Sequence, residues 1–272
     1  MRAMLSYPFM VNAFRAGTCV ALVAGVAGWF MVLRKQTFAG HTLAVVAFPG
    51  AAGATLIGVS ASLGYFTACI LAAGVIALAG QAAAGRAFSS ESAVIGTVQA
   101  FALACGLLFV SLYKGFLSGV NGLLFGSFLG ITNTQVIALA VISALVVAAL
   151  AAITRPLLFA SIDAGVAAAR GVPVRALGFV FLLLLGVAAA AASQITGALL
   201  VFALLVMPAA AAQRLTSRPA LSLLLTVVIG VLVTWAALSA AYFSTYPIGF
   251  YVTTFGFGVY LAAIAVEKVR RA

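Results

Sequence analysis

The chain has 272 residues, of which 66% are hydrophobic and 6% charged, and its formal net charge is +11. Soluble domains carry roughly 25% charged residues, and a chain with three acidic residues cannot cover a water-exposed surface with polar groups. The composition therefore excludes a soluble globular enzyme, a disordered chain and a disulfide-stapled secreted domain, and it predicts an all-α, polytopic membrane protein.

Hydropathy predicts a transmembrane helical bundle of about nine spans, with eight and ten as the neighbouring possibilities. No low-complexity linker interrupts the series, so we expect a single transmembrane domain over residues 1–272. In chain order, the predicted spans are residues 13–33, 41–60, 63–83, 92–112, 134–153, 176–192, 194–212, 220–243 and 251–266.

The basic residues fall unevenly on the two sides of the membrane that nine spans define. With the C-terminus in the cytoplasm, eleven of the fourteen bases face the cytoplasm, as the positive-inside tendency predicts. Topology thereby explains the net charge, and no nucleic-acid partner is expected. The eleven bases are Arg34, Lys35, Arg86, Arg155, Arg170, Arg175, Arg214, Arg218, Lys268, Arg270 and Arg271, and the other three are Arg2, Arg15 and Lys114.

Proline and small residues interrupt two of the predicted spans. Pro49 and Gly50 lie in the second span, and Pro208 lies in the seventh. Such breaks survive in a bilayer where other protein or water satisfies the freed backbone groups, so these residues are expected to face other helices. Gly50, Ala54 and Gly58 also recur every four residues, which predicts a ridge of small side chains that lets a neighbouring helix approach closely.

Residues 154–175 form the longest polar-flanked interruption between spans. Asp163 is suited to cap a helix N-terminus, the alanine-rich residues 164–170 favour helix, and Gly171 can supply a left-handed C-terminal turn. Pro173 prevents the helix from continuing. We expect a short, self-capped helix on the cytoplasmic side. Two roles fit it equally, docking in a groove of a soluble partner or lying on the lipid headgroups as a connector.

Asp163, Ala167 and Gly171 stand four residues apart, and the pattern D-x-x-x-A-x-x-x-G resembles the coupling helix of ABC importer permeases. The likeness extends along the chain from about residue 5 to about residue 245. Four further segments, by their order and spacing, resemble the permeases of zinc/manganese/iron-type metal-ion ABC importers. They are VLRKQTFAGHTLAVVAFPGAAGA (residues 32–54), ESAVIG (91–96), LLFGSFLG (123–130) and GALLVFALLVMPAAAAQRLT (197–216).

The resemblance implies a permease homodimer in the bacterial inner membrane, with cytoplasmic ABC ATPase subunits and an extracytoplasmic solute-binding protein as partners. It implies that a coupling helix at about residues 161–172 docks in the ATPase through Asp163, Ala167, Arg170 and Gly171. The chain has no G-x-x-x-x-G-K-[ST] phosphate loop, so the partner would hydrolyse ATP and this chain is not expected to be an enzyme. The implied cargo is a divalent zinc, manganese or iron ion carried into the cytoplasm, and no cofactor is expected to be permanently bound.

His41, the single histidine, marks the place where the sequence departs from the family. Members typically carry G-D-x-L-x-H at the start of the second span, which places an Asp and a His one helical turn apart. These two positions are His41 and Val45 here. One ligand is left where a transition-metal site uses three or four. His41 is therefore either a weak ligand for a passing metal ion in the transport pathway or a residue that makes a structural hydrogen bond.

Glu91 precedes the fourth span, and family members also carry an acid there. This carboxylate either caps the helix, where the helix dipole favours it, or contacts the pathway as a gate. Pro208 matches the broken helix of the family, so a kink that shapes the pathway is expected there. Pro49 and Gly50 are further candidates for the pathway.

Two other classes of protein are weighed against the importer permease. An ATP-independent secondary transporter or channel for a small solute fits the composition, and only the resemblance disfavours it. An intramembrane metalloprotease needs H-E-x-x-H and an aspartyl protease needs two aspartates. The chain has one histidine and one aspartate. A serine–histidine dyad is the remaining arrangement for an intramembrane enzyme, and no serine has a motif around it.

Overall fold

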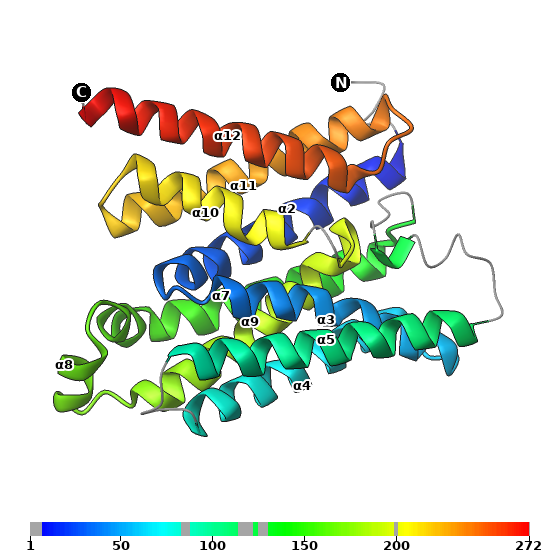
Figure 1. Ribbon diagram of the computed structural model, residues 1–272. Helices are drawn as coiled ribbons and strands as arrows, with labels where there is room; N and C mark the ends of the chain where they lie inside the picture. The colour runs from blue at the N-terminus through cyan, green and yellow to red at the C-terminus, as the bar shows by residue number, and fades with distance from the viewer. Residues whose placement is uncertain (1–6, 83–87, 114–121, 125–129, 199–200, 272) are drawn as a thin grey trace.

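The computed structural model describes residues 7–82, 88–113, 122–124, 130–198 and 201–271, and within these ranges the chain is helical with short connections. The helices run roughly side by side as an elongated bundle (Figure 1). They are α2 (Pro8–Leu33), α3 (Thr37–Leu56), α4 (Ala61–Ala82), α5 (Phe88–Leu112), α7 (Asn133–Ile162), α8 (Ala164–Ala169), α9 (Val174–Thr196), α10 (Val201–Leu215), α11 (Pro219–Tyr242) and α12 (Ile248–Arg271).

Eight of the described helices are long and apolar enough to cross a membrane, namely α2, α3, α4, α5, α7, α9, α11 and α12. The predicted span at residues 194–212 is different. Helix α9 continues to Thr196, Gly197 has φ 76°, and α10 has only 15 residues, about five fewer than a membrane crossing needs. The all-α bundle of about nine spans is therefore confirmed, with eight full-length helices and the shorter apolar helix α10 in the described part of the chain.

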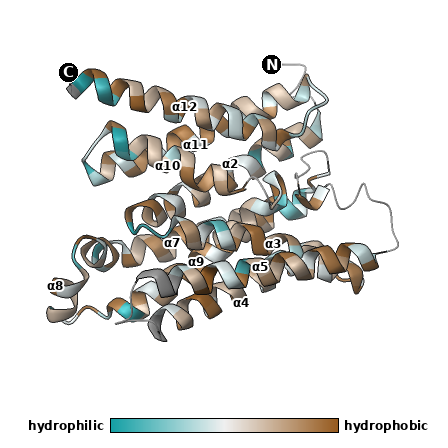
Figure 2. Cartoon of the chain, in the orientation of Figure 1, coloured by the Kyte–Doolittle hydropathy of each residue, from teal (hydrophilic) through white to brown (hydrophobic). Residues whose placement is uncertain are grey.

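The connections between helices gather at the two ends of the bundle. Helix α8 and the C-terminus lie at one end, and the N-terminus lies at the other (Figure 1). The α2–α3 connection at residues 34–36 and the α10–α11 connection at residues 216–218 share the α8 end. Hydrophilic residues lie mostly toward the helix ends, and the middle of the bundle is mostly hydrophobic (Figure 2). The described basic connections that were predicted to share one side of the membrane thus lie together, and Arg86 lies outside the described residues.

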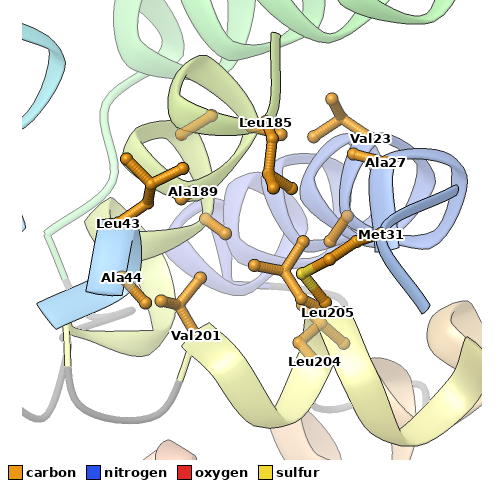
Figure 3. Packing of buried hydrophobic residues seen from close by; sticks show 14 of the residues in the cluster. Val23, Ala27, Met31, Leu43, Ala44, Leu185, Ala189, Val201, Leu204 and Leu205 are labelled. Carbon is orange, nitrogen blue, oxygen red and sulfur yellow. The ribbon is translucent and has the colours of Figure 1, made fainter. Parts of the chain in front are cut away.

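The centre of the bundle is packed from α2, α3, α9 and α10 (Figure 3). The side chains labelled in the figure are aliphatic apart from one methionine, and they are almost completely buried. Gly28 of α2 shows how closely these helices approach, because a Cβ at this position would overlap the backbone carbonyl oxygen of Leu205. In a bilayer, such close packing is a main force that holds helices together. The residues labelled in the figure are Val23, Ala27, Met31, Leu43, Ala44, Leu185, Ala189, Val201, Leu204 and Leu205.

A second close approach joins α3 to α4. A Cβ on Gly64 of α4 would overlap the carbonyl oxygen of Gly50 and would lie 2.7 Å from the Cβ of Ala54. The predicted ridge of small residues is confirmed at these two positions of α3. It is wrong at Gly58, because α3 ends at Leu56 and Gly58 adopts φ 77° in the turn that follows.

Two valine substitutions on α4 test this packing. Gly64→Val is expected to lower the free energy of unfolding by about 1–3 kcal/mol, because its side chain collides with the α3 backbone. Gly74→Val is the matched control, since a Cβ at Gly74 meets no atom within 4 Å. Thermal unfolding of the purified chain in detergent measures both. An equal fall in Tm for the two variants would contradict the close α3–α4 contact.

Candidate functional site

Helix α8 is a self-contained helical turn, and its own chain satisfies both of its ends. The Asp163 carboxylate accepts a hydrogen bond from the backbone N–H of Val166 at 2.9 Å. At the other end, the N–H of Gly171 donates to the carbonyl of Ala168 and the N–H of Val172 donates to the carbonyl of Ala167, each at 3.0 Å. Gly171 has φ 80°, so the end is a Schellman motif that glycine favours. The cap and the left-handed turn predicted for this segment are confirmed.

The surface of α8 is apolar and basic. Ala167 is fully buried and holds the helix against the bundle, whereas Arg170 and Gly171 are exposed. Two large apolar side chains beside them are also exposed, with Ile162 at 80% and Val166 at 48%. Because α8 lies at the end of the bundle, beyond the long helices, these side chains are suited to contact a partner or the lipid headgroups (Figure 1).

His41 lies in the second turn of α3, toward the α8 end of the bundle. Its ring meets the ring of Phe202 in α10 edge-to-face, with the centroids 4.8 Å apart. The two rings line a small open cavity together with Thr37 and Phe38. The His41 Nδ1 atom is buried and has no hydrogen-bond partner among the residues that the structure describes. A buried polar atom without a partner costs free energy, so this nitrogen is a candidate for contact with a further group.

The described residues offer His41 no companion ligands of the type that holds a resident metal ion. No group of three or more His, Cys, Asp or Glu residues is close enough to bind a metal in the described ranges. Val45, one turn further along α3, is apolar and 5% exposed. A single imidazole is suited to a transient contact with a cation, not to storing one.

The other residues predicted for the pathway are distributed over several helix contacts. Pro49 lies inside α3 and faces α5, where a Cβ on Gly106 would come within 3.1 Å of its Cβ. Gly50 faces α4, as described above. Pro208 is buried in α10 and lies 3.9 Å from where a Cβ on Gly230 of α11 would be. Glu91 belongs to the first turn of α5, and its side chain lies outside the described residues.

The structure also reveals polar contacts that the sequence analysis missed. The Ser62 hydroxyl donates to Gln194 Oε1 at 2.9 Å. Gln194 and Gln135 line a cavity of about 220 Å³ at the end of the bundle opposite α8. Thr42, fully buried and next to His41, donates to Gln99 Oε1 at 2.8 Å. A glutamine within an apolar span indicates a hydrogen bond to another part of the protein, because hydrocarbon provides no partner for its amide.

Comparison with known proteins gives consistent matches over nearly the whole chain. The ABC 3 transport family matches residues 6–267. The manganese transport system membrane protein MntC of Halalkalibacterium halodurans is 29% identical over 243 residues, which cover 89% of this chain and 80% of that protein. The chelated iron transport system membrane protein YfeC of Yersinia pestis is 29% identical over 225 residues, covering 83% of this chain and 75% of that protein.

The fold also matches a solved structure. PsaBC from Streptococcus pneumoniae in complex with Fab superposes with a TM-score of 0.85, covering 96% of this chain and 93% of that chain. The sequence identity is 22%, so this similarity shows the shared fold.

Proposed function

This chain belongs to the ABC 3 transport family of metal-ion ABC transporter permeases, and from that premise we propose that it imports a divalent transition-metal ion with ATP hydrolysed by separate subunits. The observation that carries the proposal is the geometry of α8. A short helix with both ends capped, exposed beyond the long helices and attached to both α7 and α9, is suited to receive a displacement from a soluble partner. Two cytoplasmic ATPase subunits would provide that displacement, one for each protomer of a permease homodimer.

Charge supports the same orientation. Arg170 and Arg175 flank the end of α8, and the described basic connections share this end of the bundle. The positive-inside tendency supports a cytoplasmic position for this end, and with it the C-terminus, in a bacterial inner membrane. The opposite end then faces outward and would receive the ion from an extracytoplasmic binding protein.

The cargo is inferred from the relatives and from His41. One relative is named for manganese transport and another for chelated iron. A neutral imidazole nitrogen suits zinc, iron, nickel or copper better than magnesium or calcium. The ring of His41 lines a cavity with Phe202 and its buried Nδ1 has no described partner, which supports a passing contact between the imidazole and such an ion.

Loss of the ATPase on substitution of Gly171 tests the role of α8. In membranes that also contain the ATPase partner, Gly171→Asp is expected to reduce the co-purified ATPase by at least about tenfold, the effect of a central interface residue. The new carboxylate places a negative charge beside the positive Arg170, on the surface that is proposed to contact the ATPase. Gly171→Asn is the control, because Asn and Asp tolerate the left-handed backbone similarly and differ in charge. Unchanged co-purification with Gly171→Asp would remove α8 from the ATPase interface.

Uptake by the reconstituted complex tests His41. Transport of labelled Mn²⁺, Zn²⁺ and Fe²⁺ into proteoliposomes is expected to require ATP, and His41→Ala should reduce it on the order of tenfold, as loss of a group at a metal site does. Phe202→Leu alters the same cavity and removes no ligand atom, so its effect should be smaller. If His41→Ala leaves uptake of all three ions unchanged, His41 is not in the pathway. Uptake without ATP would favour a secondary transporter or channel.

A further inference from the structure

Arg34 contacts three separate parts of the chain through one guanidinium group. Its Nε donates to Gln36 Oε1 at 3.1 Å, within the α2–α3 connection. Its Nη1 donates to the Ser161 hydroxyl at 3.3 Å, in the last turn of α7. The guanidinium carbon also lies 5.4 Å from the centre of the Phe181 ring in α9. All of these described partners are neutral, and burial lowers the pKa of the guanidinium from its ordinary value.

The parts joined by Arg34 are the two arms that hold α8 and the connection that begins α3. Ser161 precedes the cap residue Asp163 by two positions, so it moves with the α7 arm. Phe181 belongs to the α9 arm, is completely buried, and packs edge-to-face on Phe30 of α2 at 6.3 Å. Arg34 therefore lies at a point where the two arms of α8 meet the connection to α3.

The α2–α3 connection itself is short and rigid. The N–H of Lys35 donates to the carbonyl of Val32 at 3.1 Å, and the N–H of Gln36 donates to the carbonyl of Met31 at 3.0 Å. These two bonds form a Schellman motif in which Lys35 has φ 58°, a backbone conformation that non-glycine residues adopt rarely. A rigid connection transmits a displacement to α3 instead of absorbing it.

We propose that Arg34 is a positioning residue that transmits the displacement of α8 to the first turns of α3, where His41 lies. The inference rests on the proposed function, because α8 moves only if an ATPase drives it. The role of Arg34 is that of a positioning residue, exerted through contacts within the chain. It links the α7 and α9 arms of α8 to the helix that carries the cavity of His41 and Phe202. The planar guanidinium group of arginine holds its donors in fixed directions, so it suits this link better than the ammonium group of lysine on its flexible side chain.

The test measures ions transported per ATP hydrolysed in proteoliposomes that contain the permease and its ATPase partner. The probe is whichever of labelled Mn²⁺, Zn²⁺ and Fe²⁺ the unmodified complex transports fastest. Arg34→Leu is expected to retain ATPase binding and hydrolysis within about twofold, and to lower the ratio of ions to ATP by about fivefold or more, the lower range of couplings between sites. Arg34→Lys should recover part of the ratio, because an ammonium group still donates to Ser161.

Two further variants make the result specific. Arg218→Leu removes an arginine at the same end of the bundle whose side chain makes no described contact, and it should leave the ratio unchanged. Ser161→Ala removes one acceptor of Arg34 and should lower the ratio in the same direction as Arg34→Leu, but less. It also provides the deciding measurement if Arg34→Leu fails to assemble with the ATPase.

The outcomes separate this inference from the proposed function. An unchanged ratio in Arg34→Leu, or in Ser161→Ala where Arg34→Leu does not assemble, overturns the role of Arg34 and leaves the importer intact. If the unmodified chain binds no ATPase, or transports the ion without ATP, the proposed function fails and the inference fails with it. A loss of stability alone does not change the ratio, because transport and hydrolysis are measured on the same assembled complexes.

Discussion

The hydrogen bonds of the backbone constrain this molecule more than any side-chain contact. Within a bilayer, every peptide N–H and C=O has to find a partner inside the protein, and long helices provide those partners along their own length. The described chain therefore places its irregular backbone mainly in tight connections at the ends of the bundle. At α8 this requirement is met locally, by the carboxylate of Asp163 at one end and the Schellman bonds around Gly171 at the other. The capping bonds hold the α8 backbone without another protein, and the exposed side chains of α8 can therefore contact a partner.

Close packing follows from the same constraint. Since lipid is as apolar as leucine, helices gain little from the hydrophobic effect when they associate in a bilayer, and small residues increase their contact. Gly28 against Leu205 and Gly64 against Gly50 bring backbones together at two interfaces of the bundle. A bundle packed this tightly moves as pieces with discrete arrangements. A displacement of α8 would then reach α3 through the packing of α9 against α3 and through polar groups that connect them, among which is the Arg34 guanidinium.

Sequence reasoning predicted the features that depend on local pattern. Long apolar runs predicted the helices, and the uneven distribution of basic residues predicted that certain connections share one end of the bundle. The order of Asp163, the alanines and Gly171 predicted a capped helix, and the structure contains its capping hydrogen bonds. Features that depend on distant contacts were not predictable. Nothing in an apolar run reveals that Phe202 meets His41, because the two lie on helices far apart in the chain. In the sequence Arg34 is one of the basic residues that indicate the cytoplasmic side, and its hydrogen bond to Ser161 and its contact with the Phe181 ring require the folded bundle. The short length of α10 depends on the turn at Gly197, which hydropathy does not register.

The proposed function depends on which side of the membrane α8 faces. Its direct measurement is the labelling of a single cysteine at the exposed position Val166 by a membrane-impermeant maleimide, with Cys19, Cys69 and Cys105 replaced by alanine. In intact cells the Val166→Cys chain is expected to stay unlabelled, and in sealed inside-out vesicles it is expected to react. Labelling in intact cells would place α8 outside the cytoplasm, beyond the reach of an ATPase, and would contradict the account.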